Sequence, residues 1–373
     1  MSEHFDLAVV GGGVLGLAHA LAAARSGRRV VVFDREARAN GASARMPGVV
    51  SVTGQPAGAA WRRARRSRDI WAEVAAKAAV RVEQEGLAIV ARRPESAAVL
   101  QSFLATDMAE GCQFYPAEQA RALFPEFKGE MTGVFWSPHE LRVEARPAMA
   151  KIAAWLSEAH GVAFRWETAV TAIEGGRLVT SRGPVVAEAT VVCAGDDFRT
   201  LYADRLAGQS LTRAKAHMLR VRYDDGFEAP GVVASDLSLP RLPGFADLPE
   251  TEALLARLEA EQPEHLAHGV ALVAAQSADG SLVVGASRAF DATPDPFQPQ
   301  SVDDLILDEL AAVVGKRPKQ VLSRWTGTYA FSAERPVLLD APAPNVRVAL
   351  AASGAGASAA FALGEETIAD LFG

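Results

Sequence analysis

The sequence predicts an α/β fold of two domains, and three observations support this. The chain has 373 residues, more than one domain of roughly 100–200 residues needs. Near the N-terminus an apolar strand, a glycine-rich turn, a helix and a second strand follow one another over residues 5–34. The chain also closes with a strand, a glycine turn and a helix over residues 346–371. Strands that alternate with helices in this way are typical of a parallel sheet.

The first strand runs over residues 5–10 and leads into Gly11-Gly12-Gly13-Val14-Leu15-Gly16, which has the spacing GxGxxG. Gly11 permits the tight turn, Gly13 lets the backbone approach a pyrophosphate, and Gly16 lets the helix pack closely on the strand. The helix N-terminus offers free N–H groups and the positive end of its dipole to phosphates. The strand at 29–33 ends at Asp34, whose carboxylate can accept both hydroxyls of a ribose. These residues predict a dinucleotide site.

The remaining elements follow from apolar periodicity and turn residues. Residues 223–268 are rich in Pro, Gly and acidic residues, so we expect loops there around one helix. We expect helices at 61–79, 94–110, 146–160, 250–261, 302–314 and 358–371, strands at 86–92, 131–136, 282–286 and 346–352, and several short strands within 162–192.

Composition excludes several classes of protein. The net charge of −7 argues against binding to nucleic acid or an anionic membrane, and the basic run 62–68 is interpreted as a solvated helix face. Cys112 and Cys193 are far apart and lack metal-ligand spacing, so we expect neither a disulfide nor a metal site. No apolar run is long enough to span a bilayer and no leader precedes the first strand, which favours the cytoplasm.

No second GxGxxG is present, as a separate NAD(P)H domain would require, and the chain has no redox CxxC. Three features instead favour FAD as the cofactor. They are the loop Gly41–Arg45, the strand that ends at 191–195, and the terminal strand–turn–helix, whose helix N-terminus can face the flavin pyrimidine. Arg45 can face either the flavin or the substrate. The predicted cofactor residues are Gly11, Gly13, Val14, Leu15, Gly16, Asp34, Arg35, Ser43, Ala44, Arg45, Val170, Ala194, Gly195, Gly354, Gly356, Ala357 and Ser358.

These blocks, in this order and over essentially the whole chain, resemble the family of D-amino-acid oxidase, glycine oxidase and sarcosine oxidase. The resemblance implies oxidation of a C–N bond with hydride transfer to FAD. It also implies a Rossmann-like FAD-binding domain of the GR2 type and an α+β substrate domain, whose mostly antiparallel sheet covers the flavin. The FAD-binding domain would comprise residues 1–80, 145–215 and 320–373, and the substrate domain residues 81–144 and 216–319.

Four strings resemble one subgroup, which is associated with aminophosphonate catabolism. They are Gly41–Arg45, Leu141–Val143, Ala216–Arg220 and Ser353–Phe361. This resemblance implies a small aminophosphonate or an N-alkyl amine as substrate. The proline-rich stretch 239–243 departs from the pattern of the subgroup.

The family pattern also differs near residue 329. Amino-acid oxidases of the family have a Trp-x-Gly-x-Arg string whose arginine binds the substrate carboxylate, whereas this chain has Trp325-Thr326-Gly327-Thr328-Tyr329. A tyrosine cannot form the charged, bidentate contact of an arginine, so an ordinary α-amino acid is a less suitable substrate. Members with covalent flavin carry a cysteine in this stretch. The matching position is Gly327, so we expect non-covalent FAD.

An anionic substrate then needs another cation. Arg142 is the first candidate, in a predicted turn between the domains with His139 beside it, although both residues are also typical of an interdomain surface. Met46, Tyr329 and His217 complete the predicted substrate site. His217 and Arg220 lie on one predicted strand and should face opposite sides of it. No general base could be identified, so the catalytic residues are left unassigned.

Other functions remain open at this stage. An amino-acid oxidase of the glycine, sarcosine or D-amino-acid type is the alternative within the family. An NAD(P)H-dependent flavin hydroxylase is a second, since Ala194-Gly195-Asp196 partly resembles the Gly-Asp string of such enzymes. A flavin-bound assembly subunit without turnover is a third. Oxygen or another acceptor would reoxidise the flavin, and the oligomeric state is not predicted.

Overall fold

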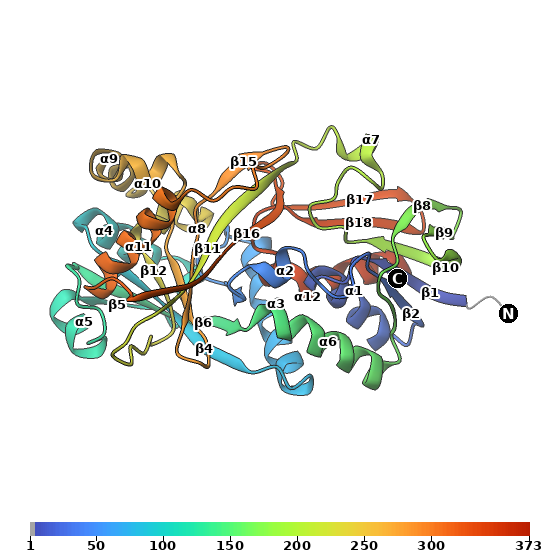
Figure 1. Cartoon of the computed structure of the whole chain (residues 1–373), viewed down its shortest axis with the longest axis horizontal. Helices are drawn as coiled ribbons and strands as arrows, with labels where there is room; N and C mark the ends of the chain where they lie inside the picture. Colours follow the sequence, from blue (N-terminus) through green and yellow to red (C-terminus); the bar gives the residue numbers. More distant parts are fainter. Residues whose placement is uncertain (1–3) are drawn as a thin grey trace.

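The computed structural model describes residues 4–373, which form two sheets side by side (Figure 1). The first sheet has the order β17-β18-β10-β1-β2-β7, and β8 joins it through β9, which pairs with β10. Its centre is parallel, while β17 and β9 pair antiparallel at its margins. The strands are β1 (His4–Val10), β2 (Val30–Phe33), β7 (Ala163–Arg165), β8 (Val170–Glu174), β9 (Arg177–Thr180), β10 (Gly183–Val192), β17 (Val337–Ala343) and β18 (Val346–Ala351).

The second sheet is antiparallel except where β12 runs parallel to β4. Its order is β15-β11-β14-β13-β12-β4-β6-β3, with β16 paired to β11 and β5 to β6. A parallel sheet beside a mostly antiparallel one confirms the predicted fold class. The strands are β3 (Val49–Val50), β4 (Val82–Ala91), β5 (Gln113–Pro116), β6 (Gly133–Val143), β11 (Thr212–Arg222), β12 (Val232–Ser235), β13 (Val273–Gln276), β14 (Leu282–Gly285), β15 (Ala289–Asp291) and β16 (Gln320–Phe331).

Four long helices pack around the first sheet: α1 (Val14–Arg25), α3 (Ala59–Lys77), α6 (Ala145–His160) and α12 (Gly356–Phe372). Buried Trp71 of α3 meets Phe361 of α12 edge-on, with 5.1 Å between the ring centroids. The other helices are α2 (Ala42–Arg45), α4 (Pro94–Phe103), η1 (Asp107–Ala109), α5 (Ala117–Leu123), α7 (Ala203–Leu206), η2 (Asp236–Arg241), α8 (Pro243–Ala246), α9 (Thr251–Glu261), α10 (Pro263–Ala267) and α11 (Gln300–Val314).

The basic run 62–68 lies on α3, as expected, but it is not simply solvated. Arg63 pairs with Glu366 and Arg66 with Glu365, so two of its arginines connect α3 to α12. Exposed pairs of this kind contribute little to stability, about 0–1 kcal/mol each. Their role here is to neutralise the charge of α3.

Three local predictions were wrong. The strand predicted at 131–136 continues to Val143, so Pro138–Arg142 is part of β6 and not a turn. The helix predicted at 94–110 ends at Phe103, and only the short turn η1 follows it. The region 223–268 contains β12 besides the expected helix α9. Pairing with distant strands, which local composition does not reveal, explains the first and the third case.

The two sheets draw on segments that alternate along the chain. Residues 320–331, assigned in advance to the FAD-binding domain, form β16 and pair with β11 of the second sheet. Strand β3, also from an FAD-binding segment, pairs with β6 of the second sheet. The domain boundaries themselves stay a prediction, and residues 1–3 lie outside the described residues.

Candidate functional site

The turn between β1 and α1 brings backbone very close to backbone. Gly11 has φ +110°, and a Cβ at this position would lie 2.2 Å from the carbonyl oxygen of Cys193. A Cβ at Gly16 would lie 1.8 Å from the carbonyl oxygen of Gly11. Only glycine avoids both clashes, so the first and the third glycine of GxGxxG are required for this turn. Gly13, the cap residue of α1, has no side chain that could accept the first N–H groups of the helix.

Asp34 and Ser43 hold this turn in place. The Asp34 carboxylate, at the end of β2, accepts the N–H of Gly12 at 2.7 Å and that of Glu36 at 2.9 Å. The Ser43 hydroxyl accepts the N–H of Val14 at 3.0 Å. The glycine turn, the acidic residue and the helix N-terminus therefore meet at one place. We name these three features the nucleotide cradle.

A cavity of about 680 Å³ begins at this cradle and extends to the second sheet. The turn after β10 and the turn before α12 both open into it, through Ala194 and Gly195 on one side and Gly354 and Gly356 on the other. The N-terminus of α12 therefore also points its dipole at the cavity, as that of α1 does. Two open helix N-termini, a glycine turn and a carboxylate in one cavity fit a dinucleotide such as FAD.

Most of the predicted cofactor residues line this cavity. Gly16 and Ala44 do not: Gly16 lies beneath the glycine turn, and Ala44 belongs to α2. The guanidinium of Arg35 pairs with Asp197 at 2.7 Å. The fifteen that line the cavity are Gly11, Gly13, Val14, Leu15, Asp34, Arg35, Ser43, Arg45, Val170, Ala194, Gly195, Gly354, Gly356, Ala357 and Ser358.

Met46 and Tyr329, two of the predicted substrate residues, also line the cavity. The Tyr329 side chain packs against the turn before α12, where a Cβ at Gly354 would lie 3.3 Å from its hydroxyl oxygen. Met46 occupies the space beside Gly327, because a Cβ there would lie 2.1 Å from Met46 Cε. The position that matches the flavin-linked cysteine is thus filled by a neighbouring side chain. This packing agrees with the expectation of non-covalent FAD, which stays a prediction.

Arg142 lies outside the cavity lining. Its guanidinium is 1% exposed and donates to Glu144 at 2.6 Å, to the Gln276 carbonyl at 3.1 Å and to Ser277 Oγ at 3.2 Å. Burial alone would raise the pKa of Glu144, but hydrogen bonds from Ser277 and Arg142 lower it below its ordinary value. The Arg142 guanidinium is fully engaged, and it connects the end of β6 to the end of β13.

His139 and His217 also lie apart from the cavity lining. The His139 ring nitrogen Nε2 is 2.6 Å from the carbonyl oxygen of Glu110, on the outer side of β6. On β11, Ala216 and Met218 line the cavity, so His217 between them points to the other face of the sheet. Burial, and then the charge of Lys215, lower the pKa of His217.

Two arginines that sequence reasoning did not select line the cavity on the side of the second sheet. Arg241 ends η2, and Arg288 lies between β14 and β15. Within residues 4–373 neither of them forms an ion pair with a carboxylate. We name the part of the cavity around Arg241, Arg288 and Tyr329 the arginine chamber. The only sequence signal for it was the unusual proline-rich stretch 239–243.

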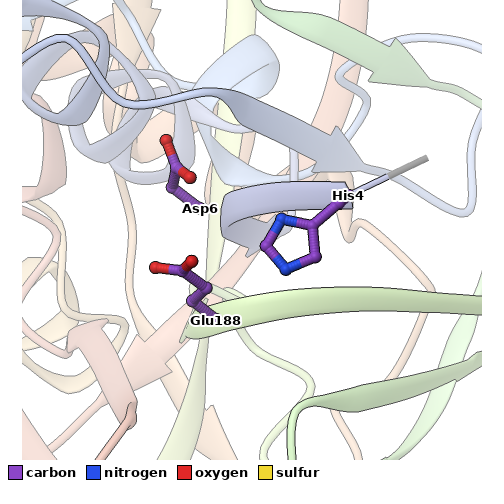
Figure 2. Close-up of side chains that lie close together, drawn as sticks. All are labelled: His4, Asp6 and Glu188. Carbon is purple, nitrogen blue, oxygen red and sulfur yellow. The ribbon is translucent and has the colours of Figure 1, made fainter.

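A group of side chains that could hold a metal ion occurs elsewhere, at the start of β1 (Figure 2). His4 and Asp6 of β1 and Glu188 of β10 place their ligand atoms within 4.8 Å of one another. His4 and Glu188 are exposed, and none of the three lines the cavity. No helix of residues 4–373 is both long and apolar enough to cross a membrane. A cytoplasmic location stays a prediction.

Comparison with known families decides the class of protein. A sequence model of the DAO family, described as FAD dependent oxidoreductase, matches residues 6–371. The chain belongs to the DAO family of FAD-dependent oxidoreductases. This membership confirms the predicted family, the FAD cofactor and the oxidoreductase activity. No curated protein sequence matches the chain.

Solved structures agree on the fold. Glycine oxidase from Geobacillus kaustophilus is 19% identical with a TM-score of 0.77, over 99% of this chain and 95% of that one. L-proline dehydrogenase from P. horikoshii is 16% identical with a TM-score of 0.77, over 98% and 92%. L-α-glycerophosphate oxidase from Mycoplasma pneumoniae, solved with FAD bound, is 15% identical with a TM-score of 0.75, over 99% and 95%. At these identities the likeness concerns the fold alone.

Proposed function

We propose that the protein oxidises a C–N bond in a small amine that carries an anionic group, with an aminophosphonate as the leading substrate. The observation that carries this is a cavity that joins the nucleotide cradle to a chamber with two arginines that have no carboxylate partner within residues 4–373. Glycine oxidase and L-proline dehydrogenase, two structures of the same fold, are named for amine substrates, which supports the reaction type. The subgroup resemblance supports the phosphonate.

The residues of the cradle fit FAD in a defined order. The N–H groups at the start of α1 would take the pyrophosphate, and Asp34 would take the ribose hydroxyls. The turn Gly354–Ser358 and the N-terminus of α12 would face the pyrimidine end of the flavin. When bound, FAD supplies the redox chemistry by accepting a hydride from the carbon next to the amine nitrogen.

The protein's own contribution is to place and shield the substrate. Ala216, Met218 and Tyr329 give the cavity largely apolar walls beside the turn before α12. Such walls exclude water and favour the neutral form of an amine, whose lone pair must be free to assist as the C–H bond breaks. The oxidised substrate is an imine, which water hydrolyses after release to a carbonyl compound and ammonia or an alkylamine. No protein nucleophile is required.

A carboxylate substrate of the glycine, sarcosine or D-amino-acid type is the alternative within the family. Tyr329 disfavours it, because a tyrosine hydroxyl offers one neutral hydrogen bond where the family's arginine offers a charged pair. The hydroxylase alternative requires reduction by NADPH, and a subunit without turnover would show no reduction by any amine. A single type of experiment separates all of these.

The experiment is anaerobic titration of the purified holoenzyme, followed by flavin absorbance. The panel contains 2-aminoethylphosphonate, its hydroxy and N-methyl derivatives, glycine, sarcosine, D-alanine, glycerol 3-phosphate and NADPH. We expect one of the phosphonate amines to bleach the flavin and glycerol 3-phosphate, which has no amine, to leave it unchanged. Bleaching by glycine, sarcosine or D-alanine instead would show that Tyr329 does not exclude carboxylates. Bleaching by NADPH alone would overturn amine oxidation itself.

A further inference from the structure

The two arginines of the chamber are held together by one stretch of backbone. The guanidinium of Arg241 donates a hydrogen bond to the carbonyl of Gly269. Gly269 in turn packs on Arg288, because a Cβ at Gly269 would lie 2.6 Å from the Arg288 carbonyl oxygen. Gly269 also has φ +58°, a conformation that favours glycine. Arg241 is therefore anchored on the backbone that adjoins Arg288, although the two are 47 residues apart in sequence.

The positive charge of this pair is not compensated within residues 4–373. Burial, and then repulsion from Arg288, lower the pKa of Arg241 to about 10, and only Tyr329 acts in the opposite direction. Other half-buried or buried arginines of the second sheet have carboxylate partners: Arg93 pairs with Asp236 at 2.9 Å, and Arg142 with Glu144 at 2.6 Å. Burying a charge without a partner costs free energy. An anion that entered the chamber would remove this cost.

The number and type of cations indicate which anion fits. Each guanidinium can present two parallel N–H donors to a pair of oxygens. Two of them match the three oxygens and two negative charges of a tetrahedral phosphonate or phosphate monoester better than the two oxygens and single charge of a carboxylate. The Tyr329 hydroxyl lies in the same chamber as a further donor. Arg35, at the cradle end, is already paired with Asp197.

We propose that Arg241 and Arg288 together bind the doubly charged tetrahedral headgroup of the substrate and make the enzyme select it over a carboxylate. This inference rests on the proposed function for the rest of the substrate, but the binding of the headgroup can be tested without any reaction. The headgroup lies between Arg241 and Arg288 with the Tyr329 hydroxyl as a further donor, and the amine end points toward the turn before α12. Arg142 and His139 take no part in binding.

The test uses ethylphosphonate, which has the headgroup but no amine to oxidise. Its dissociation constant is measured by calorimetry on the FAD-loaded protein, at a pH where it carries two charges. Arg241→Met and Arg288→Met should each weaken binding by about 10- to 100-fold, the usual effect of losing charged hydrogen bonds. Arg257→Gln, which removes a charge from exposed helix α9, should leave it unchanged. Flavin content per chain shows that each variant is folded.

Propionate, ethyl phosphate and the variant Arg288→Lys complete the design. Propionate should bind at least about 10-fold more weakly than ethylphosphonate, and Arg288→Lys should lose less affinity than Arg288→Met. Tighter binding of ethylphosphonate than of ethyl phosphate assigns the site to phosphonates, and the reverse order assigns it to phosphate esters.

Three results would overturn the proposal: unchanged ethylphosphonate binding in both methionine variants, no binding to the parent protein, or equal binding of propionate. A flavin that no amine reduces, in a protein that still binds ethylphosphonate through both arginines, would refute only the proposed function.

Discussion

The two ends of the cavity recognise charge by different means. At the nucleotide cradle, N–H groups of the backbone and a helix dipole face the ligand, and the residues come from one continuous stretch of the chain, residues 11–43. At the arginine chamber, the charged side chains of Arg241 and Arg288 face the ligand, together with the Tyr329 hydroxyl. These three residues come from three distant segments: η2, the connection between β14 and β15, and β16. A cradle of backbone suits a cofactor shared by a whole family. A chamber of side chains can change with the substrate while the fold stays the same.

The largest effect is expected at the cradle. Gly11→Ala places a Cβ within 2.2 Å of a backbone oxygen at a φ of +110°, and backbone cannot yield as a side chain can. We expect the variant to purify with no measurable FAD. Gly208→Ala is the matched control, since nothing lies within 4 Å of its added Cβ and it stands outside the cavity lining. Equal flavin content in both variants, measured by absorbance, would contradict the account of the cradle.

The next effect separates a structural arginine from a binding one. Arg142→Met leaves Glu144 without its closest cation, so the free energy of unfolding should fall by about 3 kcal/mol. The affinity for ethylphosphonate should not change, unlike that of Arg241→Met. Denaturant titration gives the first quantity and calorimetry the second. A variant of normal stability that fails to bind ethylphosphonate would restore Arg142 as a substrate residue.

The cradle end should also show a pH effect between pH 7 and 5 that the chamber lacks. His19 of α1 is fully buried, and burial lowers its pKa to about 4 despite a hydrogen bond with the Leu15 carbonyl at 2.7 Å. The unfolded chain binds a proton at this residue near pH 6.5, so stability falls as the pH drops from about 6.5 toward 4. Between pH 7 and 5 the loss from this group is about 2 kcal/mol.

His19→Gln removes this titrating group. The variant should therefore lose about 2 kcal/mol less than the parent over that range in urea titrations at each pH. The exposed His268→Gln serves as the control and should follow the parent. Identical pH dependence in all three proteins would mean that His19 is not held neutral.

The smallest effect is expected at the junction of the two ends. Tyr329→Phe keeps the ring that packs on Gly354 and removes only the hydroxyl. We expect normal FAD content and a decrease of about 3- to 10-fold in kcat/KM for the best amine, the value of one neutral hydrogen bond. Steady-state kinetics checks this. A loss above about 100-fold would indicate a catalytic role for the hydroxyl.

The same contrast explains what the sequence could predict. The cradle residues follow one another on β1, α1 and β2, so spacing alone located Gly11, Gly13 and Asp34. The chamber depends on strand pairing between distant segments, which no local pattern encodes. Arg142 was selected because 138–142 was interpreted as a turn, and its place inside β6 directs its guanidinium to Glu144 instead. Arg288 belongs to no sequence motif. It lies at the cavity because the backbone near Gly269 and Ala271 packs against residues 286–288, a contact between distant parts of the chain.

The most direct test of the central claim, oxidation of a C–N bond, is the product of a single turnover. The FAD-loaded protein is mixed anaerobically with 2-aminoethylphosphonate or its N-methyl derivative, and flavin reduction is measured together with released ammonia or methylamine. We predict one equivalent of ammonia from 2-aminoethylphosphonate per flavin reduced, with an aldehyde as the other product. The N-methyl derivative should give one equivalent of methylamine with an aldehyde or, if its methyl carbon is oxidised, of 2-aminoethylphosphonate with formaldehyde. Flavin reduction by 2-aminoethylphosphonate without release of ammonia would contradict the claim, because the electrons would then have come from another bond.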